Sequence, residues 1–86
     1  MGEQSIECRI REIIVERLFL KIQPEEIQDT DGLMEKLGVD SVSVFEIVVG
    51  LEEVFGISFE DDEFQIEKFK DVASIAKHVR EKLQAQ

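Results

Sequence analysis

The chain has 86 residues, enough to bury one hydrophobic core but too few for a second. Acidic residues outnumber basic residues by 20 to 10, so the formal net charge is −10. This balance argues against nucleic acid and anionic membranes as partners, because both attract a basic surface. We therefore expect a single domain over residues 1–86 that binds no nucleic acid and does not insert into a membrane.

The negative charge is concentrated in the middle of the chain. Residues 22–67 hold 14 acids and a single base, Lys36, whereas residues 68–86 hold five bases and two acids. Such an acidic segment is either a solvated surface or a docking face for a basic partner. Composition alone does not decide between these two interpretations.

The residue types that usually build enzymatic or metal sites are scarce. A single cysteine, Cys8, and a single histidine, His78, exclude an internal disulfide and a zinc site of the Cys/His type. Asp29, Asp31 and Gly32 do not match a calcium loop, because the glycine comes too early. His78 has no recognisable catalytic partner, and we expect it at the surface or half-buried on the last helix. We expect a cytoplasmic protein that is not an enzyme and binds no metal.

The first half of the chain reads as one helix followed by a long connector. Ser5 is a candidate N-cap, and the apolar pattern of this helix continues to residues 20–22. Pro24 cannot lie inside a continuing helix. Residues 23–39 are therefore expected to be a loop whose apolar residues pack across the bundle.

The strongest helical pattern opens at Asp40 and Ser41 and ends before Gly56, which suits a left-handed C-terminal cap. Its apolar stripe consists of Val44, Val48, Leu51 and Phe55, widened by Phe45, Ile47, Val49 and Val54. Val44, Val48, Leu51 and Phe55 are expected to belong to the core.

The acidic residues 60–63 lie where a short third helix would begin, and Asp71 is a candidate cap for the last helix. The apolar positions of that helix are Val72, Ile75, Ala76, Val79 and Leu83. Together these patterns predict an all-α fold, a small four-helix bundle of three main helices and one short helix, with a long first loop.

Ser41 is the residue with the clearest chemical potential. A hydroxyl at a helix N-terminus can carry a phosphate, because free backbone N–H groups and the helix dipole stabilise the added negative charge. Asp-Ser before an apolar helix is equally consistent with simple capping. Local sequence leaves both interpretations open.

The pattern around this serine resembles the acyl carrier proteins. It runs Leu-Met-Glu-Lys-Leu-Gly-Val-Asp-Ser-Val over residues 33–42, with Glu46 and then Leu-Glu-Glu-Val-Phe-Gly-Ile over residues 51–57. Length, acidity, helix order and long first loop extend the resemblance to nearly the whole chain. The resemblance implies a 4′-phosphopantetheine arm joined to Ser41 by a phosphodiester, with Asp40 helping to present the serine. The thiol of the arm would carry acyl groups as thioesters.

The resemblance also implies partners: a phosphopantetheinyl transferase, acyl chains, and acyl-loading and acyl-transferring enzymes with basic docking patches. It suggests a monomer, whose core residues could also line space for a bound acyl chain. The candidate docking residues are Val42, Glu46, Glu52, Glu53 and Lys36.

Three positions, Val42, Ser43 and Lys36, depart from the usual family pattern. They leave open whether the chain serves fatty-acid, polyketide or other specialised biosynthesis. An alternative from another class is an unmodified acidic helical interaction module in which Ser41 is only a helix N-cap.

Overall fold

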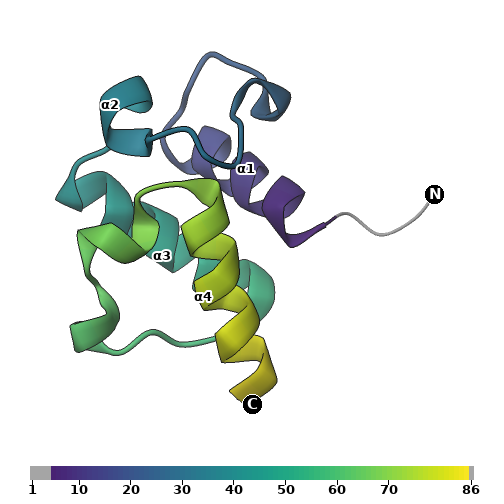
Figure 1. The fold of residues 1–86 in the computed structure, drawn as a ribbon, viewed down its shortest axis with the longest axis vertical. Coiled ribbons are helices and arrows are strands. Elements are labelled where there is room, and N and C mark those ends of the chain that lie inside the picture. Colours follow the sequence, from purple (N-terminus) through teal and green to yellow (C-terminus); the bar gives the residue numbers. More distant parts are fainter. Residues whose placement is uncertain (1–4, 86) are drawn as a thin grey trace.

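Four α-helices joined by short 3-10 turns make up the computed structural model, which describes residues 5–85 (Figure 1). The α-helices are α1 (Ile6–Arg17), α2 (Leu33–Leu37), α3 (Ser41–Phe55) and α4 (Val72–Ala85), and the 3-10 turns are η1 (Pro24–Glu26), η2 (Asp61–Glu63) and η3 (Ile66–Phe69). The Cα envelope measures 35 × 34 × 20 Å, so the bundle is flat. No strand occurs within residues 5–85, and the predicted all-α class is confirmed.

The core lies where α1 and α4 cover one side of α3. Val44, Val48 and Leu51 of α3 are buried as predicted. Gly50 marks the close approach of α1, because a Cβ there would lie 2.7 Å from the Ile13 side chain. The remaining buried apolar residues are Ile10, Ile13, Ile14, Ile27, Leu33, Val39, Ile47, Ile57, Phe59, Phe69, Val72, Ile75, Ala76 and Val79. Helices of modest intrinsic propensity are thus held by tertiary packing.

The apolar stripe of α3 is narrower than the sequence predicted. Phe45 is 53% exposed and Val54 is 41% exposed, because they lie on the side of α3 that the other helices leave open. Phe55 is half-buried, with the Arg9 guanidinium 5.0 Å from its ring centroid. The widening positions Phe45 and Val54 therefore lie outside the core, and Phe55, which was predicted to belong to it, lies at its edge.

The first helix begins as predicted, since the Ser5 side chain accepts a hydrogen bond from the Cys8 amide. It ends at Arg17, however, and not at residues 20–22. Phe19 adopts a left-handed backbone conformation with φ = 53°. The Leu20 amide then donates to the Val15 carbonyl at 3.1 Å, which is the hydrogen bond of a Schellman C-cap. The apolar pattern continues past the helix because the following loop also packs on the core.

Phe19 occupies a position that glycine normally takes, and its side chain is 88% exposed. Phe19→Gly would relieve the left-handed strain and remove almost no packing, so we expect the free energy of unfolding to rise by about 1 kcal/mol. Urea denaturation measures the change. Phe19→Ala is the matched control, because alanine keeps the Cβ and hence the strain. Equal stabilisation by both variants would contradict this explanation.

The connector at residues 23–39 contains a helix that the sequence did not reveal. α2 is a single turn and a half, too short to show a helical period. The connector is fastened to the start of α4 by two backbone hydrogen bonds, from Leu33 to Lys70 at 2.8 Å and from Ala73 to Asp29 at 2.9 Å. The expected loop therefore crosses the bundle as a fixed segment.

The short third helix expected to begin at residues 60–63 is instead the 3-10 turn η2, followed by η3. Glu63 ends η2, and its carboxylate accepts a hydrogen bond from the Glu60 amide at 2.6 Å. The same carboxylate reaches α4, where it lies 3.1 Å from His78 Nε2 and 2.5 Å from Lys82 Nζ. This use of the acid to bind α4 favours a tight turn over a longer helix.

His78 is buried, with 6% of its surface exposed, so the expectation of a surface or half-buried histidine without a partner is wrong. Its ring lies 4.9 Å from the Phe59 centroid and 5.7 Å from the Phe69 centroid. Partial burial acts to raise the pKa of Glu63, but hydrogen bonds from Lys82, Glu60 and His78 outweigh it and lower the pKa to about 2. The link between α3 and α4 is anchored by an ionised carboxylate.

Candidate functional site

Ser41 is the first residue of α3, and Asp40 before it is extended, with φ = −118° and ψ = −172°. The Asp40 carboxylate accepts a hydrogen bond from the Ser43 amide at 2.9 Å, and its carbonyl accepts one from the Val44 amide at 2.9 Å. These two bonds define Asp40 as the N-cap. The helix start is therefore fixed without any contribution from the serine side chain.

The Ser41 side chain is exposed, and its hydroxyl forms no hydrogen bond to another residue in the range 5–85. The interpretation of Ser41 as the helix N-cap is wrong, because Ser41 already lies inside the helix. Asp40 and Ser41 are both good capping residues, and the extended backbone of Asp40 assigns it the role. The adjacent hydroxyl is left free for chemistry.

The electrostatics at this helix start favour an added anion. The first turn of α3 carries no acidic side chain, and the helix dipole places partial positive charge at its N-terminus. Hydrogen bonds from the backbone amide and hydroxyl of Ser43 lower the pKa of Asp40, so this carboxylate stays ionised. A phosphate on Ser41 would thus be close to one fixed negative charge and to the positive end of α3.

Separate roles for the two residues predict different stabilities for two alanine variants. Asp40→Ala removes the cap and is expected to lower the free energy of unfolding by about 0.5–2 kcal/mol. Ser41→Ala is expected to change it by only a few tenths of a kcal/mol, because the hydroxyl makes no internal bond. Thermal or urea denaturation of both variants tests the assignment. A Ser41→Ala loss as large as the Asp40→Ala loss would contradict it.

Apolar side chains surround the serine on the open side of α3. Val42 is 71% exposed, and Phe45, four residues after Ser41 and so on the same helix face, is 53% exposed. Phe64 packs edge-to-face on Phe45, with ring centroids 6.1 Å apart. Ile66 beyond it is 43% exposed. Sequence reasoning found Val42 but counted Phe45 only as part of the apolar stripe of this helix, although its four-residue spacing from Ser41 was a usable signal.

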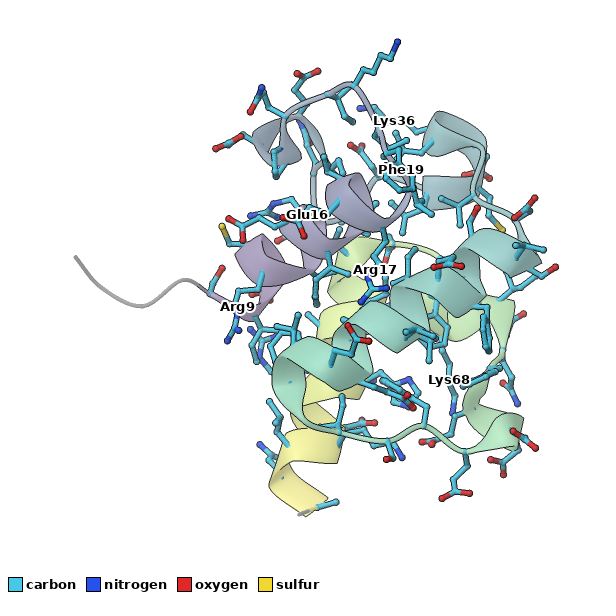
Figure 2. The ribbon with its side chains drawn as sticks, turned by 180° about the vertical axis from the view of Figure 1, so that it is seen from behind. Arg9, Glu16, Arg17, Phe19, Lys36 and Lys68 are labelled. Carbon is cyan, nitrogen blue, oxygen red and sulfur yellow. The ribbon has the colours of Figure 1, made fainter. Side chains whose placement is uncertain are left out.

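The acidic candidates on α3 fall into two groups. Glu46 and Glu53 are exposed, and Glu53 pairs with Arg17, which reaches from α1 toward α3 in Figure 2. Glu52 is half-buried, and its carboxylate accepts a hydrogen bond from the Phe59 amide at 2.9 Å. Glu52 therefore holds the link that follows α3 and is not part of the exposed acidic surface.

Lys36 lies on α2, where its Nζ is 3.0 Å from Asp31 Oδ2. This pair partly neutralises the one base of the acidic segment. Within residues 5–85 no cluster of three or more histidine, cysteine or acidic side chains could hold a metal ion. No helix in that range is both long and apolar enough to cross a membrane.

Comparison with known proteins agrees with this geometry. The sequence model of a family described as "Phosphopantetheine attachment site" matches residues 8–79. An acyl carrier protein from Wolinella succinogenes is 37% identical over 70 residues, which are 81% of this chain and 87% of that protein. An acyl carrier protein from Nitratidesulfovibrio vulgaris is 35% identical over 68 residues, 78% of this chain and 87% of that protein.

A solved structure shows the same fold. The solution structure of a holo acyl carrier protein from Nitrosomonas europaea superposes with a TM-score of 0.82 at 27% identity, covering 94% of this chain and 99% of that one. The exposed, unbonded hydroxyl at the start of α3 fits the 4′-phosphopantetheine group that the family carries. The chain belongs to the phosphopantetheine-binding acyl carrier protein family, and it is a carrier protein rather than an enzyme.

Proposed function

We propose that this chain carries acyl groups as thioesters on a 4′-phosphopantetheine arm attached to Ser41. The observation that supports it best is the free Ser41 hydroxyl at the first position of α3, with capping performed by Asp40. The arm supplies the thiol that holds the acyl group. The helix start supplies a favourable position for the phosphodiester.

The chain's own residues anchor the arm and do not activate the serine. His78, the single histidine, is buried on α4 with its Nε2 bonded to Glu63, and within residues 5–85 it forms no hydrogen bond to Ser41. We therefore place the base that accepts the Ser41 proton on the transferase. This requirement explains why attachment needs a partner enzyme.

Attachment at Ser41 is directly testable by intact mass. Incubation with a broad-specificity phosphopantetheinyl transferase, coenzyme A and magnesium is expected to add one phosphopantetheine group. Ser41→Ala is expected to abolish the addition while leaving the helical circular dichroism unchanged. Ser43→Ala is the matched control and is expected to remain modified. Modification at Ser43 or Ser58, or none with several transferases, would contradict the proposal and favour an unmodified interaction module.

We also propose that partner enzymes bind α3 through its exposed acids and apolar side chains. Glu46 and Glu53 are seven residues apart and lie on nearly the same helix face, leading away from Ser41. A basic patch at the entrance of an enzyme's active site complements them and directs the arm inward. Val42 and Phe45 add apolar contact close to the attachment point.

Charge reversal tests this docking surface. Exposed charge pairs contribute about 0.2–1 kcal/mol each, and they act mainly on the association rate. Glu46→Lys and Glu53→Lys are therefore expected to slow acyl loading of the holo protein several-fold at low salt and much less at high salt. The control is Glu16→Lys on the exposed side of α1 (Figure 2). Equal slowing by all three variants, or none, would show that α3 is not the docking helix.

The proposal also covers the biosynthetic pathway, the oligomeric state and the cellular location of the carrier. A role in fatty-acid, polyketide or related biosynthesis follows from the carrier assignment, and Lys36 and Ser43 make a specialised pathway as consistent as a general one. Lys36 lies beside the docking helix and would modulate partner choice by opposing its acids. A monomeric, cytoplasmic, single-domain carrier over residues 1–86 is the form that we propose.

A further inference from the structure

Some basic side chains of this acidic chain form ion pairs with carboxylates, and others do not. Of its ten lysines and arginines, five form ion pairs: Arg11, Arg17, Lys36, Arg80 and Lys82. Arg9 lies over the Phe55 ring. With twice as many acids as bases available, an unpaired base is unexpected. Within residues 5–85 the side chains of Lys21, Lys68, Lys70 and Lys77 form no ion pair.

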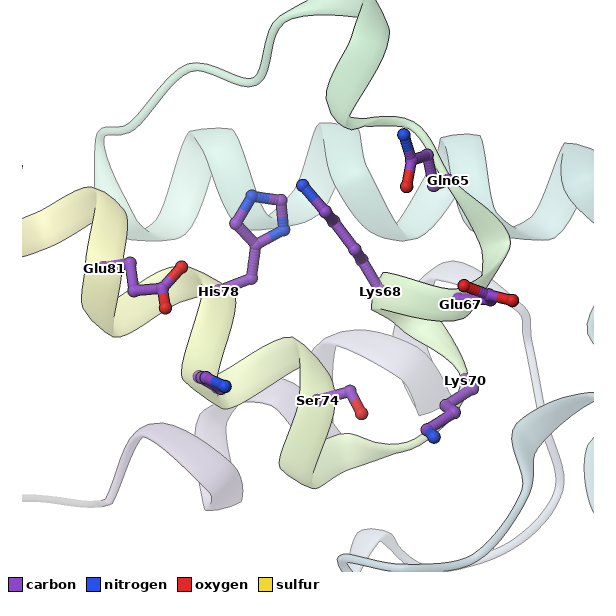
Figure 3. Close-up of a pocket in the computed structure, with 8 residues that line it drawn as sticks. Gln65, Glu67, Lys68, Lys70, Ser74, His78 and Glu81 are labelled. Atoms are coloured by element: carbon purple, nitrogen blue, oxygen red, sulfur yellow. The ribbon is translucent and has the colours of Figure 1, made fainter.

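Three of these four unpaired lysines line the same hollow. Lys68 and Lys70 come from η3 and its C-cap, and Lys77 comes from α4. The hollow has a volume of about 410 Å³ and is shown in Figure 3. Glu67 and Glu81 also line it, so cations exceed carboxylates by one. We call this region the basic hollow.

The basic hollow is lined by residues 65–70 and by α4, and no residue of α3 lines it. α4 is in front of α3 in Figure 1 and behind it in Figure 2. The envelope is 20 Å thick along its shortest axis. A partner bound at the basic hollow would therefore leave Ser41 and the exposed acids of α3 accessible.

A buried polar atom without a hydrogen-bond partner is a second indication that the basic hollow binds a ligand. His78 lines the hollow, and its Nδ1 is buried with no hydrogen-bond partner within the described residues. Because Glu63 is ionised, it accepts the hydrogen bond from Nε2 of His78, and in the tautomer with a proton on Nε2 alone Nδ1 is an acceptor. The His78 ring and the Lys68 side chain point toward one another in Figure 3. Lys68 is exposed, so a displacement of its side chain would open the ring edge to a donor.

We propose that the basic hollow is a second docking surface, which binds a carboxylate-rich segment of a partner protein. The lysines complement the carboxylates of such a segment, while its backbone N–H groups can donate to His78 Nδ1, Glu67 and Glu81. A compact phosphate dianion fits less well, because it offers a single O–H donor and both glutamates repel its concentrated charge. This surface does not depend on the arm at Ser41.

The test uses the ¹⁵N-labelled 86-residue chain titrated with a pentaglutamate peptide at low salt and followed by NMR. Shifts are expected at residues 67–81, with binding that weakens as salt is added. The triple variant Lys68→Gln, Lys70→Gln, Lys77→Gln is expected to raise the apparent Kd about tenfold, from the loss of three exposed charge contacts. Lys21→Gln, which removes the fourth unpaired lysine, is the matched control and is expected to bind normally.

Two results would overturn the proposal. One is binding that the triple variant does not weaken, or peptide shifts confined to α3. The other is tighter binding of inorganic phosphate than of the peptide at the same residues, which would identify a small-anion site. Thermal unfolding of the triple variant verifies that it is folded. If it is unstable, the single variant Lys77→Gln replaces it, and its apparent Kd for the peptide is expected to rise two- to threefold. None of these outcomes bears on phosphopantetheine attachment at Ser41, which the intact-mass experiment tests separately.

Discussion

The hydrogen bond from the Ser43 amide to the Asp40 carboxylate allows two neighbouring residues to do different work. A helix N-terminus has unpaired amides, and one of them must be satisfied by a side chain or by water. Because Asp40 does this from an extended backbone, Ser41 enters the helix with its hydroxyl free. The positive end of α3 remains available to an anion on that hydroxyl. Attachment and helix initiation thus do not compete for the same oxygen.

The same chain must remain folded with a large excess of acid. Four of its ten arginines and lysines are placed where segments distant in sequence meet: Arg11 with Asp29, Arg17 with Glu53, Arg80 with Glu7 and Lys82 with Glu63. Each exposed pair contributes little alone, but together they remove repulsion at the contacts between helices. Glu46, which forms no ion pair within residues 5–85, and Glu53, which stays exposed beside Arg17, remain within reach of a basic partner.

The parts of the structure that were predictable are those encoded by local spacing and capping. Asp71 caps α4 through a 2.7 Å hydrogen bond from the Ser74 amide, and Gly56 ends α3 with φ = 68°, as the sequence indicated. α2 was missed because a helix of five residues has no measurable period. The contact of His78 with Glu63, which are 15 residues apart, depends on how η2 packs on α4, and no local pattern encodes it.

The candidate site was predictable in identity but not in geometry. The motif around Ser41 singled out the serine, yet two adjacent capping residues gave no means to tell which one caps the helix. Glu52 looked like its exposed neighbours because a helix pattern does not reveal that the link at Phe59 folds back to receive its carboxylate. The periodicity of a helix therefore cannot predict the role of a side chain that bonds to a neighbouring loop.

The link between α3 and α4 is held unequally along its length. Near its start the Phe59 amide is bound by Glu52, and Glu63 is bound by His78 and Lys82. Residues 64–68 that follow are mostly exposed, and Phe64 rests against Phe45 by an edge-to-face ring contact. Regions with few buried contacts open at lower free energy than the core. The part of the link that packs on Phe45, one helical turn from Ser41, is therefore expected to move most easily, while the polar anchors hold Phe59 on α3 and Glu63 on α4.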